Sequence, residues 1–241
     1  SLIRFPQQQM ITVIRDSSPP QRTLQDKLMK KYITPLITEA AHWVLVVDID
    51  EYVYPLDAAL CIVNILDAYP DAVGRVWLPW KVFGSNGHLT QPLEGIVAGF
   101  TKRKEVDHFL GQHALGYGKS FTRVRGSVEL LTHHSGNGDP LMYYSNGTKL
   151  QYGDHFAKTK LGEKDAHHQP LQLNHYMFQS RDYYQRVKCV RGGGQSGRVA
   201  KYTMAFYDEH EPRANAVEDL GLKERYETRN ISCVSKFASV A

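Results

Sequence analysis

Cysteine is scarce in this sequence, which holds three cysteines among 241 residues: Cys61, Cys189 and Cys233. An odd number this small does not make a disulfide framework, and no two of them have the close spacing of a cysteine-ligated zinc site. The chain is therefore expected to depend on a hydrophobic core rather than on covalent or zinc cross-links.

Long apolar runs are also lacking. No run approaches the roughly 20 residues that a membrane span needs, and the N-terminal residues SLIRFPQQQM have no apolar stretch typical of a signal peptide. We expect no membrane span within this chain. Two locations stay open: a Golgi or secretory lumen, with an anchor upstream of this chain, or the cytoplasm. Sequons at Asn146 and Asn230 permit the first.

Neither sign of charge is in large excess. The 29 basic and 25 acidic residues give a net charge of +4, whereas nucleic-acid-binding proteins concentrate far more positive charge. No nucleic-acid partner is therefore predicted. With 241 residues, of which 42% are hydrophobic, the chain is long enough for one substantial core, so one main domain is expected.

The first third of the chain alternates strand and helix signals. Ser18, followed by two prolines, predicts the start of a first helix, and Asp57 is predicted to cap a second. Strands are predicted around these helices at residues 10–16, 43–47 and 73–79. This order predicts an α/β fold with a largely parallel sheet.

The rest of the chain is richer in loops. Ser180 is predicted to cap a helix over residues 181–191 that ends at a run of three glycines. Short strands are predicted at residues 95–103, 118–126 and 171–178. We predict one domain over residues 1–195 and a helical or loosely packed C-terminal extension over residues 196–241.

Three carboxylates, Asp48, Asp50 and Glu51, follow directly after the apolar run at residues 43–47. Asp48 and Asp50 are predicted to point the same way, with Ile49 facing the core, because side chains alternate along a strand. Ligands of open parallel sheets bind beyond the carboxyl ends of the strands, and neighbouring carboxylates repel unless a cation lies between them. This predicts an Mg²⁺ or Mn²⁺ site shared with a phosphate. The alternative is a solvated acidic loop or a helix cap.

Four segments in this order resemble the glycosyltransferase family 2 and family 92-like group. They are HWVLVVDIDEYVYP, WLPWKVFGSNGH, GKSFTRVR and LNHYMFQSRDYYQRVKCVRGG. The resemblance implies a GT-A-like fold, with a mostly parallel central sheet flanked by helices. It also implies transfer of a sugar, with inversion, from a nucleotide-sugar donor to a carbohydrate or other hydroxyl acceptor, assisted by Mn²⁺ or Mg²⁺.

The resemblance implies roles for the acids as well. Asp50 is expected to ligate the metal, and Asp48 belongs to the same metal site, where it holds the ribose or a metal-bound water. Glu51 is expected to support catalysis by orienting the site. His175 is a candidate third ligand, since imidazole suits Mn²⁺. The alternative for His175 is a buried histidine that is hydrogen-bonded to the backbone.

Cationic side chains are the candidates for binding the donor's diphosphate. Lys119 opens a predicted strand, where a mobile point charge suits a phosphate, although a surface lysine is the alternative. Lys188 and Arg191 lie three residues apart on one face of the predicted helix over residues 181–191. The glycine run that follows is either a lid over the donor or a linker.

The acceptor is expected to contact the loop after the strand at residues 73–79. Trp80 can stack on a sugar face, and Ser85 and His88 can bind its hydroxyl groups, although an ordinary Asn-Gly turn is the alternative. His134, beside a glycine-rich loop, joins this acceptor-binding group. Asp139 is the preferred general base for the acceptor hydroxyl, over the other loop acids Glu94, Asp107 and Asp154.

Glycosyltransferases of the GT-A type usually begin with two further strand–helix units, which hold the donor's base and ribose. Here one predicted strand and one predicted helix precede Asp48, so we expect an N-terminally shortened form. Either the chain is a fragment of a longer protein, or its donor pocket is built differently.

A non-catalytic nucleotide-sugar or carbohydrate-binding module is therefore the second functional hypothesis. A Mg²⁺-dependent phosphohydrolase is a third, for which the sequence does not supply a convincing set of acids and lysine.

Overall fold

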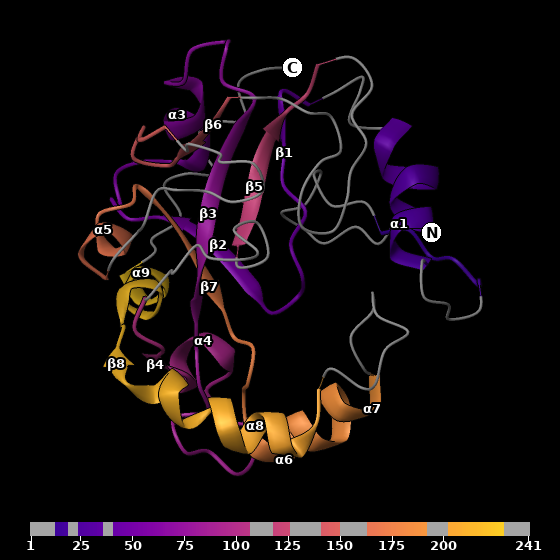
Figure 1. The fold of residues 1–241 in the computed structure, drawn as a ribbon, viewed down its shortest axis with the longest axis vertical. Coiled ribbons are helices and arrows are strands. Elements are labelled where there is room, and N and C mark those ends of the chain that lie inside the picture. The colour runs from indigo at the N-terminus through magenta and orange to yellow at the C-terminus, as the bar shows by residue number, and fades with distance from the viewer. Residues whose placement is uncertain are drawn as a thin grey trace.

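The computed structural model describes residues 13–18, 24–35, 41–106, 118–125, 141–149, 163–191 and 202–228. Within these ranges six strands form one sheet in the order β1–β5–β3–β7–β2, and β6 pairs with β3 off this path (Figure 1). The strands are β1 Trp43–Val44, β2 Glu51–Pro55, β3 Arg75–Val82, β5 Gly118–Arg123, β6 Met142–Tyr144 and β7 Leu171–His175.

The strand directions in this sheet differ from the prediction. β1–β5, β3–β5 and β2–β7 are antiparallel, while β3–β6 and β3–β7 are the parallel pairs among the described strands. The chain is therefore a mixed α/β protein with a mostly antiparallel sheet, and the predicted mostly parallel sheet is wrong. The order of strands and helices along the chain does not by itself determine which strands pair.

The core lies around β3 and β7. Val76 and Leu78 of β3 and Leu171 and Leu173 of β7 each have at most 1% of their surface exposed. Strands that are covered on both faces are rich in apolar residues without strict alternation, as the centre of β3 is, whereas β7 alternates leucine with polar residues although all five of its residues are buried. The strands predicted at residues 73–79 and 171–178 are therefore confirmed, with shifted ends.

Helix α3 (Ile62–Asp67) covers part of this core with Ile65 and Leu66. It begins later than predicted. Cys61 occupies the N-cap position, whereas Asp57 accepts a hydrogen bond from a backbone N–H two residues later (2.8 Å) in the preceding turn. Asp57 therefore stabilises the turn that leads to the helix rather than the helix itself.

The first predicted helix forms as α1 (Leu24–Leu28) and the π-helical η1 (Met29–Ile33). Met29 is its buried residue and packs against Val44 and Val46. The half-buried segment that leads to the carboxylates is therefore covered on one side by this helix.

Two predicted strands differ from the structure in the residues that it describes. Residues 13–16, the described part of the first, have no regular structure. The predicted strand at residues 95–103 is instead a short helix, α4 (Ile96–Gly99), followed by β4 (Lys102–Arg103), which pairs with β8 (Val217–Glu218). Gly95, whose φ of +86° favours glycine, follows a turn and is the N-cap residue of α4.

The helical segment after β7 lies beside the C-terminal helices (Figure 1). Ser180 caps it as predicted, since its side chain accepts a hydrogen bond from the N–H of Tyr183 (3.2 Å). The rings of Tyr184 and Tyr207 lie 4.9 Å apart and join the two helical segments. The remaining helices are α5 Glu163–His167, α6 Arg181–Tyr183, η2 Tyr184–Lys188, α7 Cys189–Arg191, α8 Met204–His210, η3 Pro212–Asn215 and α9 Gly221–Thr228. No helix in the described ranges is long and apolar enough to cross a membrane.

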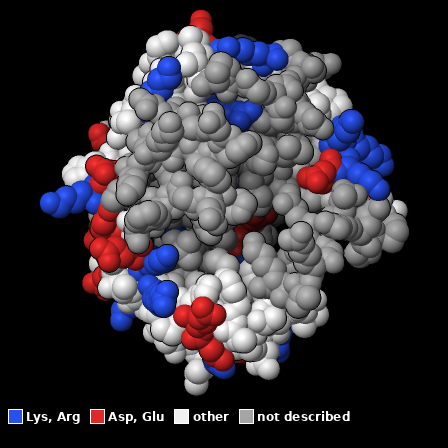
Figure 2. All heavy atoms as spheres, in the orientation of Figure 1, with Lys and Arg blue, Asp and Glu red and all other residues white. Residues whose placement is uncertain are grey.

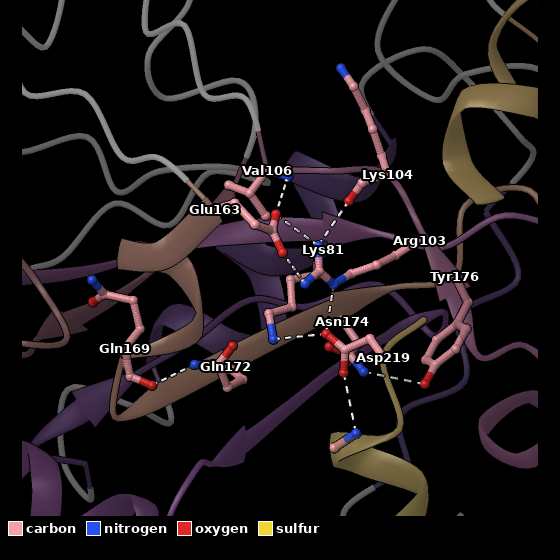
Figure 3. A network of polar contacts seen from close by, with 11 residues as sticks. Lys81, Arg103, Lys104, Val106, Glu163, Gln169, Gln172, Asn174, Tyr176 and Asp219 are labelled. Atoms are coloured by element: carbon pink, nitrogen blue, oxygen red, sulfur yellow. Dashed lines mark hydrogen bonds and ion pairs between the residues drawn. The ribbon is translucent and has the colours of Figure 1, made fainter. Parts of the chain in front are cut away.

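A buried network of charges connects the C-terminal segment to the sheet (Figure 3). Asp219 accepts hydrogen bonds from Lys81 Nζ (3.0 Å) and Arg103 Nε (2.6 Å), and the Arg103 guanidinium also pairs with Glu163. Arg103 is fully buried. Burial by itself raises the pKa of Asp219, but the two cations outweigh it and hold the pKa below its ordinary value. Each buried charge in the network therefore needs its partners.

We expect Asp219→Ala to lower the free energy of unfolding by about 3–5 kcal/mol, because the change leaves Lys81 and Arg103 buried without their shared carboxylate. Urea denaturation at pH 7, followed by circular dichroism, measures this loss. Asp208→Ala is the matched control, since it removes an exposed partner of Arg181 and should leave the midpoint almost unchanged. Equal midpoints for the two variants would contradict the role of the network.

Candidate functional site

The three carboxylates lie in a tight turn that leads into β2. The N–H of Glu51 donates to the carbonyl of Asp48 (3.0 Å), and the N–H of Asp48 donates to the Glu51 carboxylate (2.9 Å). The side chain of Asp50 points inward and is buried, whereas Ile49 is 90% exposed. The prediction that Ile49 faces the core was wrong, because these residues form a turn before a strand rather than the end of one.

The pairing of β2 with β7 brings His175 to this turn. Glu51 and His175 are direct partners across the two antiparallel strands. The His175 Nε2 atom lies 3.9 Å from the Asp50 carboxylate, and the ring of Trp80 packs against the imidazole at a centroid distance of 4.5 Å. Two of the predicted metal ligands are therefore neighbours, and Trp80 borders them.

Two lysines from other elements complete the cluster. Lys119 of β5, whose side chain is 1% exposed, lies 3.1 Å from Asp48 and 3.3 Å from Glu51. Lys188 of η2 donates a hydrogen bond to the Asp50 carboxylate. Each carboxylate thus has a lysine partner, and residues far apart in the sequence converge at one place. We call Asp48, Asp50, Glu51, Lys119, His175 and Lys188 the carboxylate–lysine cluster.

Burial determines the protonation states of two members of the cluster. Burial raises the pKa of Glu51 to about 7, although Lys119 opposes the shift. Burial also lowers the pKa of His175 to about 4, although Asp50 opposes that shift. His175 is therefore neutral at pH 7, the form in which an imidazole nitrogen can bind a metal. Glu51 exchanges its proton near neutral pH.

Two buried polar atoms of the cluster have no hydrogen-bond partner among the described residues. They are Glu51 Oε1 and His175 Nδ1. Buried polar atoms are nearly always paired, so such atoms mark a site where an ion, a water molecule or a ligand group belongs. The alternative for His175 was a buried ring that is hydrogen-bonded to the backbone. Its Nδ1 atom has no such hydrogen bond to the residues that the structure describes.

The donor atoms of the cluster suit a divalent cation in their chemistry. Asp48 and Asp50 supply carboxylate oxygens and His175 a neutral nitrogen, a set that fits Mn²⁺. However, no group of three or more His, Cys, Asp and Glu residues in the described part of the chain is assembled for a metal. Lys188 contacts the Asp50 oxygen that lies nearest to His175. A cation at Asp50 would therefore have to displace this ammonium group.

The loop after β3 is held in place by other partners. Ser85 is buried, and both its N–H and its hydroxyl donate to Glu211 Oε1, at 2.9 Å and 2.5 Å. His88 Nε2 lies 3.1 Å from the carbonyl oxygen of Gly99. The polar side-chain atoms of these two predicted acceptor-binding residues are thus hydrogen-bonded within the protein. Their contact with an acceptor stays a prediction.

Three further residues were predicted to belong to the site: Arg191, Asp139 and His134. Arg191 is exposed at the end of α7, the last residue described before the glycine run. Asp139 and His134 lie outside the described residues.

Tyr202 was not predicted to belong to the site. The Lys188 ammonium lies 5.8 Å from the centre of its ring. Burial, followed by the negative charges of Asp50, Asp48 and Glu51, raises the pKa of the Tyr202 hydroxyl. Its neighbours in the sequence form no motif, so only the fold reveals that it lies beside the cluster.

On the face of the molecule shown in Figure 2, the charges of the described residues do not indicate a further ligand site. On the face shown in Figure 2, coloured Lys and Arg side chains and coloured Asp and Glu side chains alternate around the molecule. The described residues of this face therefore do not form one large field of a single sign.

A scan against protein-family models and a search of the curated proteins each find no match to this chain. The functional argument therefore depends on the carboxylate–lysine cluster itself.

The Glu51 pKa predicts how stability depends on pH. Glu51 takes up a proton on folding between the unfolded value of 4.5 and the folded value of about 7. Its contribution to stability is therefore full below the unfolded pKa and is lost as the pH rises through about 7. Between pH 5 and 8, roughly, the wild-type free energy of unfolding should fall relative to that of Glu51→Gln. Chemical denaturation in metal-free buffer measures the difference, and parallel pH curves would refute the shift.

Proposed function

We propose that this chain is a divalent-metal-assisted glycosyltransferase with a GT-A-like, mixed sheet, which transfers a sugar from a nucleotide-sugar donor to a carbohydrate or other hydroxyl acceptor. One observation carries the proposal. Asp48, Asp50, His175 and two lysines, drawn from three of the four segments that resemble this group of enzymes, meet in one partly buried cluster. A diphosphate with its metal ion needs this combination of carboxylates and cations.

In this proposal Asp50 and His175, with Asp48, hold Mn²⁺ or Mg²⁺. The bound ion would neutralise the negative charge that develops on the leaving diphosphate. His175 is suited to this role because burial keeps its imidazole neutral. Glu51 remains beside Lys119 and the backbone of Asp48, where it orients the turn that presents the two aspartates.

The two lysines have different roles because they are held differently. Lys119 is nearly inaccessible and lies between Asp48 and Glu51, so it keeps the turn in shape. The Lys188 side chain is 16% exposed and contacts Asp50. If a metal ion were held at Asp50, this ammonium would have to leave the carboxylate and could then bind the donor's diphosphate. Arg191, one turn further along the same helical segment, is the second candidate cation for the donor.

Trp80 is the residue best suited to contact a sugar. It is partly exposed and packs against His175, so a sugar that lies on its ring is close to the proposed metal ligands. Asp139 remains the candidate general base for the acceptor hydroxyl. Inversion follows if the acceptor attacks from the side opposite to the diphosphate.

A non-catalytic nucleotide-sugar-binding module is the second candidate, and one observation favours it. Each carboxylate of the cluster already has a lysine partner, so the cluster is electrically compensated without a metal ion. A module of this kind would bind a nucleotide without metal and would not turn over a donor.

Calorimetric titration with Mn²⁺, alone and with a panel of nucleoside diphosphates, tests the donor site. We expect binding in which the metal and the diphosphate strengthen each other. Asp50→Asn should weaken metal binding by about tenfold or more, since it removes a charged ligand and keeps the side-chain shape. Asp208→Asn, an exposed acid, is the control. Failure of every nucleotide to bind would refute the donor site, and tight binding without turnover of any nucleotide-sugar would favour the module.

The Lys188→Met variant is expected to change the affinities for metal and for nucleoside diphosphate in opposite directions. Removing the ammonium from Asp50 should strengthen the binding of Mn²⁺ alone by about tenfold, or roughly 1.4 kcal/mol. The same change should weaken the binding of the nucleoside diphosphate, because its cationic partner is lost. Arg186→Met, which alters an exposed cation of the same helical segment, should change neither affinity. Weaker binding of the metal by Lys188→Met would contradict the competition at Asp50.

A further inference from the structure

The turn after β6 presents a side chain that the carboxylate–lysine cluster does not use. The N–H of Gly147 donates to the carbonyl of Tyr144 (3.0 Å), and the N–H of Tyr144 donates to the carbonyl of Thr148 (2.9 Å). A bridge between Tyr143 and Lys149 closes the loop. Gly147 has a φ of +83°, as expected for a short hairpin loop that ends in a glycine bulge. The loop therefore has a defined shape.

Asn146 lies exposed at the tip of this loop. Its Oδ1 atom accepts a hydrogen bond from the N–H of Thr148 (2.9 Å), which leaves the amide nitrogen Nδ2 outside this bond. Its own N–H donates to the side chain of the buried Gln169 (3.1 Å). The backbone N–H of Asn146 is thus bonded to a buried side chain while the residue itself is exposed, in the sequence Asn146-Gly147-Thr148 that marks an N-glycosylation acceptor.

A largely apolar cavity opens beside the same asparagine. It has a volume of about 500 Å³ and is lined by Asn146 and Gly147 together with Tyr69, Tyr143, Pro170 and Asn64. The rings of Tyr69 and Tyr143 lie 6.5 Å apart. One face of a pyranose ring consists of C–H groups, which pack against aromatic rings, and N-acetyl groups add a methyl group. The cavity is large enough for a small ligand and contains the attachment point itself.

We propose that Asn146 is an N-glycosylation site and that the first N-acetylhexosamine packs against Tyr143 in this cavity. The co-reactant is a lipid-linked oligosaccharide diphosphate, and an enzyme of the cell that produces this protein makes the transfer. Nδ2 forms a bond to the sugar C1, the bond from C1 to the diphosphate oxygen breaks, and the diphosphate leaves with the electron pair. One amide proton passes to a base. This inference does not depend on the proposed glycosyltransferase activity.

Cell-free translation with microsomal membranes, of the full chain behind a cleavable secretion leader, tests the modification. We expect a mass increase, removable by an endoglycosidase, for the Asn230→Gln variant, which lacks the second sequon, and for Thr148→Ser combined with Asn230→Gln. Asn146→Gln and Thr148→Ala, each combined with Asn230→Gln, should lack it, because each destroys the Asn146 sequon. An unmodified Asn230→Gln variant overturns the proposal. This readout does not require the variants to fold.

Trimming the glycan to one sugar tests its packing. We expect the protein that carries one sugar to have a higher Tm than Asn146→Gln, which carries none. The same Tm difference should persist when both proteins also carry Tyr143→Phe, and should disappear when both carry Tyr143→Leu. Leucine keeps the apolar volume that supports the core but removes the ring, and any loss of packing that affects the glycosylated and the unglycosylated protein equally cancels in this double-mutant cycle. An equal difference in Tyr143→Leu, or none in the wild type, overturns the predicted contact.

Discussion

The register of β7 between β3 and β2 is the constraint on which the rest of the structure depends. All five residues of β7 are buried. His175 is paired with Glu51 on one side and Val82 on the other, and Asn174 is paired with Tyr52 and Lys81. Since successive side chains point to opposite faces, this register places His175 on the face of Glu51 and Val82 and Asn174 on the face of Tyr52 and Lys81. A slip of β7 by one residue would turn His175 to the opposite face, away from Asp50. The candidate site therefore depends on this register.

The C-terminal segment is part of this arrangement. Asp219 neutralises Lys81 and Arg103 in the interior, and Glu211 accepts the hydrogen bonds of Ser85 at the end of β3. Buried ionic groups seldom stabilise a protein more than apolar ones would, but they penalise arrangements that leave them unpaired. We infer that these contacts select the position of residues 202–228 more than they strengthen the fold. Tyr202, which begins that segment, is thereby held beside Lys188.

Elements with strong local signals could be predicted from the sequence. β3 has an apolar centre, β7 has leucines at alternate positions, and Ser180 carries the side chain that caps a helix. The turn at Asp48 could not be predicted, because an apolar run does not reveal which of its residues are covered: Val47 is 43% exposed. Strand direction depends on pairing between distant segments, which accounts for the wrong parallel sheet. For the site, the resemblance led us to expect the acids and His175 together, and the structure places His175 beside Asp50 and Glu51. Their role as metal ligands stays a prediction. The pairing of Lys119 and Lys188 with individual carboxylates depends on contacts across 71 and 138 residues, for which no local pattern exists.

Charge balance indicates how such a cluster can serve the proposed function. Three carboxylates face two lysines, and burial moves the Glu51 pKa to about 7, so the cluster is nearly neutral without a ligand. A divalent cation and a nucleotide diphosphate bring charges that largely cancel each other. They can therefore enter together without leaving a large uncompensated charge in a partly buried place, whereas either one alone must disturb the existing pairs. This argues that metal and donor bind cooperatively in the proposed enzyme. In this proposal Lys188 is the group expected to move when metal and donor bind, because it is the more accessible of the two lysines and contacts Asp50, the proposed metal ligand.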